Sequence, residues 1–249
     1  IVLERFKMDK ALKIVQAFLI PLVIFGIILS TLHQSSLGTL YLIMPTKLHP
    51  FWYSPLLPVF FFLSAIAVGL AMTIFESSMS SKYFHRQLEL PILQELGRVL
   101  WVVLWVYAIL RFEDLLHRGM LKQMLVPGYE MYLFWLEVLL AMAAPIVLLS
   151  FKNLRNSPGG LYFIAVLVVL GFITNRLNVS ITGMETSAGL HYIPKWTEYA
   201  ITGMIVAGGF AMFGLAAKYL PIFPDEKEHE AAAPQPQVVT ASVMTHAGD

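Results

Sequence analysis

Residues 52–75 read WYSPLLPVFFFLSAIAVGLAMTIF, and this run contains no charged side chain. A hydrocarbon layer about 30 Å thick is crossed by about 20 mostly apolar residues in a helix. Backbone groups inside lipid must find their hydrogen bonds within the segment, so a run of this length is helical there. The stretch therefore predicts a transmembrane helix.

The composition of the whole chain agrees with this prediction. Hydrophobic residues make up 57% of the 249 residues and charged residues 13%, and the mean hydropathy is +0.70. Soluble globular chains carry about 25% charged residues, so this composition excludes a soluble enzyme, a nucleic-acid-binding protein and a disordered chain. The net charge of +1 is too small to attract polyanions by long-range electrostatics. The chain has no cysteine, which excludes disulfides, thiolate zinc sites and iron–sulfur clusters held by its own residues.

Six stretches have the length and apolar character of membrane spans, and each is bounded by proline, glycine or charge. The expected fold is an all-α polytopic bundle over residues 1–220. The acidic, alanine- and proline-rich residues 221–249 are predicted to form a disordered cytoplasmic tail. The predicted spans are 11–32, 52–75, 91–112, 129–151, 160–177 and 196–220.

Lysine and arginine are divided unequally between the two sides of the predicted bundle. Ten lie on the side that holds the N-terminus, the loops after the second and fourth spans, and the C-terminal tail; six lie on the opposite side. Cytoplasmic loops carry an excess of these residues, so both termini are predicted to face the cytoplasm. Aromatic residues near span ends, including Trp52, are interpreted as interfacial anchors.

Ionisable side chains at membrane depth are costly and usually mark a proton pathway or a buried pair. Toward the non-cytoplasmic side, His33 and Gln34 lie in the polar run STLHQSSLG, residues 30–38, which we expect to form a broken helix or a re-entrant turn. Histidine exchanges protons near neutral pH, so His33 is a candidate for proton transfer. A structural histidine bonded to a neighbouring helix is the alternative.

Glu137 lies about two turns into the fourth span, without a charged partner on its own helix. A lone carboxylate there is either protonated or paired with a group on another helix, and proton relay and structural pairing both remain open. Asn175 and Arg176 end the fifth span, and the permanently charged Arg176 needs an acceptor or a carboxylate. Arg111 closes the third span, where we expect its side chain to snorkel to the lipid headgroups.

A second polar group lies toward the cytoplasmic side. Glu95 and Arg98 are three residues apart on one helix, so they share a face and can form an ion pair, and Glu76 ends the second span. A plain ion pair and a hydrated entry for protons both remain open for these residues. Polar groups toward both faces with a drier middle are the layout expected of a proton path that enters from each side.

Of the seven histidines, only His33 lies near membrane depth. A membrane b-type haem is commonly held by paired histidines on facing helices, so we expect no haem in this chain. We also predict no metal site, and the sequence contains no nucleotide-binding or nucleophile motif.

Several sequence runs follow one another in order. They are residues 30–40, STLHQSSLGTL, and 47–53, KLHPFWY; residues 61–71, FFLSAIAVGLA; and residues 175–180, NRLNVS, followed by Gly183-Met184, His191-Tyr192 and Pro194-Lys195-Trp196. Together they resemble the NrfD / polysulfide-reductase family of membrane subunits, in particular the HybB-like subunits of hydrogenase-2-type complexes. The resemblance extends to about residue 224. Members of that subgroup have about ten spans, so the chain resembles their C-terminal part, with about four N-terminal spans missing.

The resemblance implies a haem-free membrane subunit that passes electrons between an iron–sulfur partner and menaquinone or ubiquinone, with coupled proton transfer, and holds no catalytic centre itself. The implied partners are a periplasmic ferredoxin-like subunit, the Ni/Fe-hydrogenase large and small subunits or another catalytic subunit, and membrane lipid. The implied location is the bacterial cytoplasmic (inner) membrane, with several spans and a cytoplasmic C-terminus.

The expected site residues fall into three groups. The quinone vicinity is His33, Gln34 and Asn175. The proton-transfer group is His33, Glu137 and Arg176. The cytoplasmic proton entry is Glu76, Glu95 and Arg98.

Two alternatives remain open. Within the family, the catalytic partner is a multihaem cytochrome or a molybdenum reductase instead of a hydrogenase. Outside it, the chain is a transporter or a membrane anchor without a redox role, since broken helices and buried charges also occur in transporters. A transporter is expected to show an inverted repeat, which we do not find among these spans, and an anchor does not need ionisable groups at membrane depth.

Overall fold

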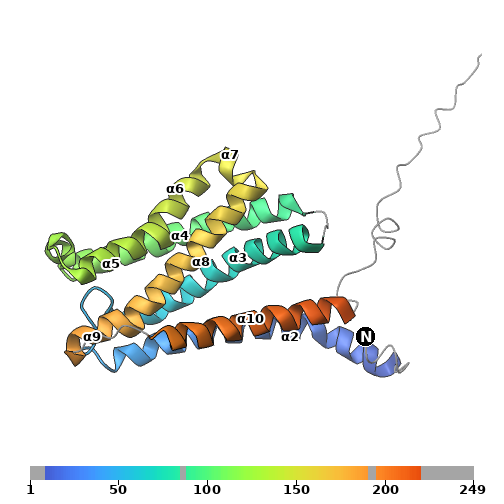
Figure 1. The fold of residues 1–249 in the computed structure, drawn as a ribbon, viewed down its shortest axis with the longest axis horizontal. Helices are drawn as coiled ribbons and strands as arrows, with labels where there is room; N and C mark the ends of the chain where they lie inside the picture. The colour runs from blue at the N-terminus through green and yellow to red at the C-terminus, as the bar shows by residue number, and fades with distance from the viewer. Residues whose placement is uncertain (1–8, 85–87, 190–194, 220–249) are drawn as a thin grey trace, which may run out of the picture. The chain divides into compact units, whose positions relative to one another are not determined.

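The computed structural model describes residues 9–84, 88–189 and 195–219, and their regular structure is helical, as the sequence predicts. The predicted tail lies outside the described residues. The chain divides into two compact units, Phe18–Tyr192 and a second one formed by Ile1–Ala17 with Ile193–Asp249. The described elements are α2 Asp9–Leu42, α3 Leu57–Phe84, α4 Leu90–His117, η1 Met120–Leu125, α5 Tyr129–Val138, η2 Leu139–Ala143, α6 Ala144–Ser150, α7 Lys152–Arg155, α8 Pro158–Leu177, η3 Asn178–Thr182, α9 Gly183–Ala188 and α10 Trp196–Tyr219 (Figure 1).

Five helical stretches within the described residues are long and apolar enough to cross a membrane. They overlap the first, second, fourth, fifth and sixth predicted spans. The third predicted span forms helix α4, which carries five charged side chains and is not among the five, so the prediction of six spans differs by one. The five stretches are Ala17–Leu42, Leu57–Tyr83, Tyr129–Ser150, Pro158–Glu185 and Trp196–Ala216.

Local signals set the helix ends in the larger unit. Pro158 stands in the first turn of α8, where its missing N–H breaks no helical hydrogen bond. Ser157 caps this helix, because its Oγ accepts a hydrogen bond from the backbone N of Gly160 at 3.1 Å. Helix α4 is followed by Gly119, whose φ of 68° is a left-handed conformation that glycine adopts without strain.

The larger unit is a bundle in which α8 packs against α3, α5 and η2, and α3 packs against α4 (Figure 1). Its middle is apolar, and small side chains there let the helix backbones approach closely. The fully buried residues of this middle layer, each 0% exposed, are Ala67 and Ala71 of α3, Leu100 and Leu104 of α4, and Ala165 and Val168 of α8.

Helix α2 is continuous from Asp9 to Leu42, through Pro21 and the polar run 30–38. The expected broken helix or re-entrant turn is therefore wrong. The physical reason is that hydroxyl groups in this run bond to carbonyls one turn earlier on the same helix. Ser36 Oγ, for example, donates to the carbonyl oxygen of Leu32 at 3.0 Å.

The C-terminal end of α2 lies against the start of α3. A Cβ at Gly38 would be 2.8 Å from the carbonyl oxygen of Leu57, so the close approach requires a residue without a side chain. Farther toward the N-terminus, the apolar side chains of α2 are exposed, and the same is true of α10 in the other unit. Apolar surfaces of this extent are typical of helices that face lipid.

Two π-helical segments interrupt the helices of the bundle. The first, η2, directly follows α5, and the second, η3, directly follows α8. Pro145 stands just after η2 and cannot donate to the carbonyl of Ala141, four residues earlier, so a change in the hydrogen-bond pattern before it is expected. Single π-helical turns are often found at functional sites, which directs attention to the polar residues beside them, Glu137 and Asn175.

Candidate functional site

Glu137 of α5 is 1% exposed, and its carboxylate accepts hydrogen bonds from three different segments. Trp52 Nε1, in the loop between α2 and α3, donates to Oε2 at 2.8 Å. Asn175 Nδ2 of α8 donates to Oε1 at 2.7 Å, and Asn178 Nδ2 of η3 donates to Oε2 at 2.9 Å. Glu137 is thus hydrogen-bonded to groups on other segments of the bundle.

Close backbone packing beside the carboxylate fixes these distances. A Cβ at Gly171 of α8 would lie 2.5 Å from the carbonyl carbon of Leu140 in η2, and it would also overlap the backbone of Ala141. The two segments run in opposite directions on either side of α7 (Figure 1). Glu137 lies four residues before Ala141 and Asn175 four residues after Gly171, so their side chains meet one turn away.

All three donors to Glu137 are neutral N–H groups. Indole Nε1 and amide Nδ2 atoms donate, whereas an ionised carboxylate only accepts, and hydrogen bonds to the charged form stabilise it. Within the part of the chain that the structure describes, no ion pair to Glu137 forms within 4.0 Å. The carboxyl group is therefore held in one orientation by groups that do not themselves exchange protons.

Arg176 is adjacent to Asn175 but points to other neighbours. Its NH2 atom donates to Ser64 Oγ at 2.7 Å, and its guanidinium carbon lies 3.5 Å from the ring centroid of Phe61. The cation–π contact offsets part of the cost of burying this cation. The NH1 atom is buried and has no hydrogen-bond partner among the residues that the structure describes. The structure thus joins Glu137 to Asn175, while the hydrogen bonds of Arg176 to described residues leave one of its buried donors available.

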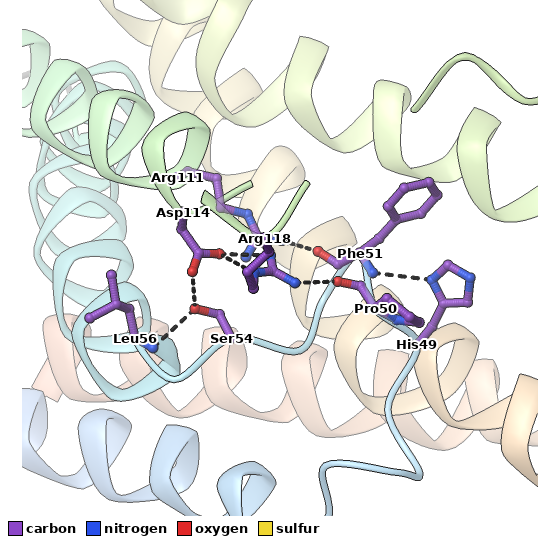
Figure 2. A network of polar contacts seen from close by, with 8 residues as sticks. All are labelled: His49, Pro50, Phe51, Ser54, Leu56, Arg111, Asp114 and Arg118. Atoms are coloured by element: carbon purple, nitrogen blue, oxygen red, sulfur yellow. Dashed lines mark hydrogen bonds and ion pairs between the residues drawn. The ribbon is translucent and has the colours of Figure 1, made fainter. Parts of the chain in front are cut away.

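A second polar network lies beside the loop that carries Trp52, and it comes from the end of α4 (Figure 2). Arg111 is 2% exposed, and its NH2 atom donates to the carbonyl oxygen of Phe51 at 2.9 Å. The prediction that Arg111 snorkels to the headgroups is therefore wrong, because the loop supplies a buried acceptor. Its Nε atom is buried, and within the described part of the chain nothing accepts a hydrogen bond from it.

His49 lies at the start of the turn that leads to Trp52, whose backbone N donates to the carbonyl oxygen of His49 at 3.0 Å. Its Nδ1 atom accepts a hydrogen bond from the backbone N of Phe51 at 3.2 Å, and its own backbone N donates to the carbonyl oxygen of Gly183 at 2.7 Å. Burial lowers the pKa of His49 below its ordinary value of 6.5, while the carboxylate of Glu130 acts in the opposite direction. The neutral imidazole is therefore the form that fits the loop, since a protonated Nδ1 could not accept this bond.

Among the described residues, the remaining predicted site residues make no hydrogen bond or ion pair to Glu137. His33 is exposed on α2, and Gln34 beside it is half-buried. Glu95 and Arg98 form the predicted ion pair at 2.8 Å, with side chains 65% and 56% exposed. Glu95 stands 16 residues before Arg111 on α4, about 24 Å along the helix axis, and so lies at the opposite end of the bundle.

Glu76 is exposed near the C-terminal half of α3. With Glu95 and Arg98 it belongs to the end of α3 and the beginning of α4, two helices that pack against each other. The apolar middle layer separates this end from Glu137. The drier middle that the sequence predicts is thus present in the described bundle.

Sequence analysis missed two partners of Glu137. Trp52 was interpreted as an interfacial anchor because it stands at the end of a predicted span, but it is 0% exposed and that interpretation is wrong. Asn178 was not singled out. The signal for it was its spacing from Asn175, because polar residues three apart share a helix face.

An apolar groove of about 750 Å³ lies between α4 and the α5–α6 segment. Val138, the neighbour of Glu137, lines it, and the groove does not include His33, Gln34 or Asn175. Its walls are aromatic and aliphatic apart from two polar side chains, Glu113 and Ser150. Representative lining residues are Trp105, Phe112, Trp135, Val138, Met142 and Val147.

Comparison with known proteins places this site in a family context. A family model described as "Polysulphide reductase, NrfD" matches residues 3–188. A protein of Nitratidesulfovibrio vulgaris (strain Hildenborough) is 35% identical over 240 residues, which cover 92% of this chain and 61% of that protein.

Two further relatives have descriptive names. The probable Ni/Fe-hydrogenase 2 b-type cytochrome subunit of Escherichia coli (strain K12) is 31% identical over 237 residues, covering 92% of this chain and 60% of that subunit. The menaquinone reductase integral membrane subunit of N. vulgaris is 31% identical over 226 residues, covering 82% of this chain and 54% of that subunit. The chain thus spans between about half and three fifths of the length of these relatives.

Proposed function

The chain belongs to the polysulphide reductase NrfD family of integral membrane subunits, and we propose that it is a quinone-interacting part of a respiratory oxidoreductase of the Ni/Fe-hydrogenase type. In this proposal the subunit passes electrons between an iron–sulfur partner and the menaquinone or ubiquinone pool, with coupled proton transfer. The names of two relatives, a hydrogenase 2 subunit and a menaquinone reductase subunit, support it.

The observation that carries the proposal is the buried, triply hydrogen-bonded carboxylate of Glu137. A membrane anchor has no need of such a group, because an ionisable side chain at membrane depth costs free energy. We assign Glu137 the role of a proton carrier. Its Oε1 or Oε2 atom accepts the proton while the indole of Trp52 and the two asparagine amides keep the carboxylate in place.

Two separate features of the described bundle are candidates for contact with a quinone, and Arg176 is not among the residues that line the groove. The groove beside Val138 offers apolar walls of the kind that an isoprenoid chain requires. The NH1 atom of Arg176 is a buried donor that no described residue accepts from, as a quinone carbonyl needs. His33, Gln34 and Asn175 are the other side chains that we propose near the carbonyl oxygens. A bound quinone would supply the two-electron, two-proton redox chemistry.

We propose that protons enter from the cytoplasm near Glu76, Glu95 and Arg98, at the end of the bundle away from Glu137. The division of basic residues supports this orientation. Arg111, counted with the opposite side from the sequence, is buried in the bundle, and Arg176 of the same side is half-buried. Without them the bias toward the predicted cytoplasmic side is larger.

The proposed setting is the bacterial inner membrane, with a cytoplasmic C-terminus. The proposed partners are a periplasmic ferredoxin-like iron–sulfur subunit and the hydrogenase large and small subunits, or another catalytic subunit. We propose that this chain holds no haem. Because one relative is named a b-type cytochrome subunit, a reduced-minus-oxidised absorbance spectrum of the purified complex is the test, and a b-type haem band retained by this subunit would contradict the proposal.

The test of function is Glu137→Gln in the full-length subunit of the assembled complex. Quinone-linked turnover is expected to fall, because an amide cannot carry the proton, while electron transfer from the same donor to an artificial dye is retained. His33→Ala is expected to show the same separation if His33 lies near the quinone. Co-purification of the partner subunits verifies that each variant assembles.

The matched control is Glu89→Gln, the same chemical change at an exposed position before α4. It is expected to leave both activities unchanged. If Glu137→Gln retained the quinone-linked rate of the control, Glu137 would have no part in proton transfer and the proposal would lose its main support.

A further inference from the structure

The last turns of α4 hold the loop that carries Trp52 by two backbone carbonyls (Figure 2). Arg118 NH1 donates to the carbonyl oxygen of Pro50 at 2.6 Å, and Arg111 NH2 donates to that of Phe51 at 2.9 Å. These are the two residues immediately before Trp52. Arg111 on α4 and Arg118, the residue that caps its C-terminal end, therefore fix the chain at the point from which the indole reaches Glu137.

Asp114 orients this arrangement from the same helix. Its Oδ2 atom accepts from Arg118 Nε at 3.0 Å and NH2 at 2.7 Å, and its Oδ1 atom accepts from Ser54 Oγ at 2.8 Å. Ser54 lies two residues after Trp52, and its Oγ atom accepts from the backbone N of Leu56 at 3.0 Å. The loop is thus bonded to α4 on both sides of Trp52.

This network is largely shielded from solvent. The side chain of Asp114 is 6% exposed and that of Arg118 is 19% exposed. Buried ion pairs add little net stability because desolvation offsets the Coulomb attraction, so a role in fixing geometry is the better explanation for retaining one. Charge-assisted and fork-shaped contacts restrict both distance and direction, which is what a single indole N–H bond at 2.8 Å to a carboxylate needs.

We propose that Arg111, Asp114 and Arg118 form a clamp that positions the indole of Trp52 on the carboxylate of Glu137. Asp114 and Arg118 are positioning residues, since they act on Glu137 only through the loop. The clamp's importance for turnover rests on the proposed function of Glu137, but its effect on the bond between Trp52 and Glu137 does not.

The test is a double-mutant cycle read by infrared spectroscopy on membranes that contain the assembled complex with the full-length subunit. The carboxyl stretching band of Glu137 reports the hydrogen bonds that the group accepts, and it is assigned by its loss in Glu137→Gln. Trp52→Phe removes the indole donor and defines the reference shift. Arg118→Ala is expected to shift the band in the same direction, and the double variant is expected to shift it no further than Trp52→Phe alone.

Asp114→Asn serves as a second clamp variant that keeps the side-chain volume, so the test holds if Arg118→Ala fails to assemble. Lys122→Ala, an exposed basic residue in the neighbouring η1 segment, is the control and is expected to leave the band in place. An unshifted band in the clamp variants would overturn the proposal. So would a shift that adds fully to that of Trp52→Phe, because the network would then act on Glu137 independently of Trp52.

Failure of this inference is distinguishable from failure of the proposed function. If Glu137→Gln keeps full quinone-linked turnover, the proton-transfer role fails while the infrared cycle still tests the clamp. If Glu137→Gln loses that turnover but the clamp variants leave the band unshifted, the function stands and the clamp is refuted.

Discussion

Substituting Gly171 by alanine would test the packing that sets the Glu137 site. The methyl group would lie 2.5 Å from the carbonyl carbon of Leu140, whereas ordinary van der Waals contact begins at 3.4 Å. Because the obstructing atoms belong to the backbone of η2, no side-chain rotation can make room. Helix α8 and η2 must therefore separate by at least about 0.9 Å at this level, because the backbone atoms of Ala141 lie closer still.

The separation is large enough to break the bond one turn away. Asn175 Nδ2 and Glu137 Oε1 lie 2.7 Å apart, and an additional 0.9 Å or so would take them beyond the range of N–H···O bonds, which ends at about 3.2 Å. Overpacking a core costs about 1–3 kcal/mol, and a lost hydrogen bond to a charged group costs about 1.5–3 kcal/mol. The expected loss in the free energy of unfolding is therefore on the order of 2–6 kcal/mol.

The assay is unfolding of the detergent-solubilised complex, together with the infrared band of Glu137. Gly69→Ala on α3 is the control, since nothing lies within 4 Å of a Cβ there; its stability is expected to stay within about 1 kcal/mol of the unaltered protein. If Gly171→Ala matched Gly69→Ala in stability and left the band unchanged, the close contact between α8 and η2 would not be what sets the site.

Three further expectations concern other parts of the structure. Since burial lowers the pKa of His49, its neutral form favours the fold; this contribution is complete above pH 6.5 and is lost as the pH falls through the lowered pKa. The melting temperature should therefore drop more steeply on acidification than in His49→Asn, and parallel curves would contradict this. Trp52→Phe should cost about 1.5–3 kcal/mol of unfolding free energy by removing one donor to the Glu137 carboxylate, and a cost near zero in the same unfolding assay would mean that the bond does not form. Arg98→Ala should change stability by less than about 1 kcal/mol, because both side chains of its ion pair are more than half exposed, and a larger loss on thermal unfolding would show that the pair is structural.

The helices could be predicted from the sequence because apolar length alone decides them. Even α4, which has too mixed a composition to be counted with the five apolar stretches, forms the helix expected over its span. The run 30–38 was predicted wrongly because polarity in a span suggests a break, whereas serine and threonine hydroxyls can bond within a helix, as Ser36 does.

The centre of the candidate site could also be predicted, but its surroundings could not. Glu137 stands out as a carboxylate in an apolar run, which is visible without a structure. Its donors lie 85, 38 and 41 residues away in sequence, and no local pattern states which helix faces meet. Arg111 shows the same limit. Its position at the end of a span predicts that its side chain reaches the lipid headgroups, whereas in the folded protein it donates to the carbonyl oxygen of Phe51 in the loop.

The apolar middle layer has an electrical consequence. Side chains such as Leu100, Leu104 and Val168 form an insulating slab between the two polar ends of the bundle, so the voltage across a membrane would drop mainly over this slab. A charge that traverses the full voltage exchanges about 2.3 kcal/mol with a potential of 100 mV. A polar residue in place of Leu104 would admit water into this apolar layer. The insulating distance would then be shorter, and a smaller share of the membrane voltage would fall across the layer.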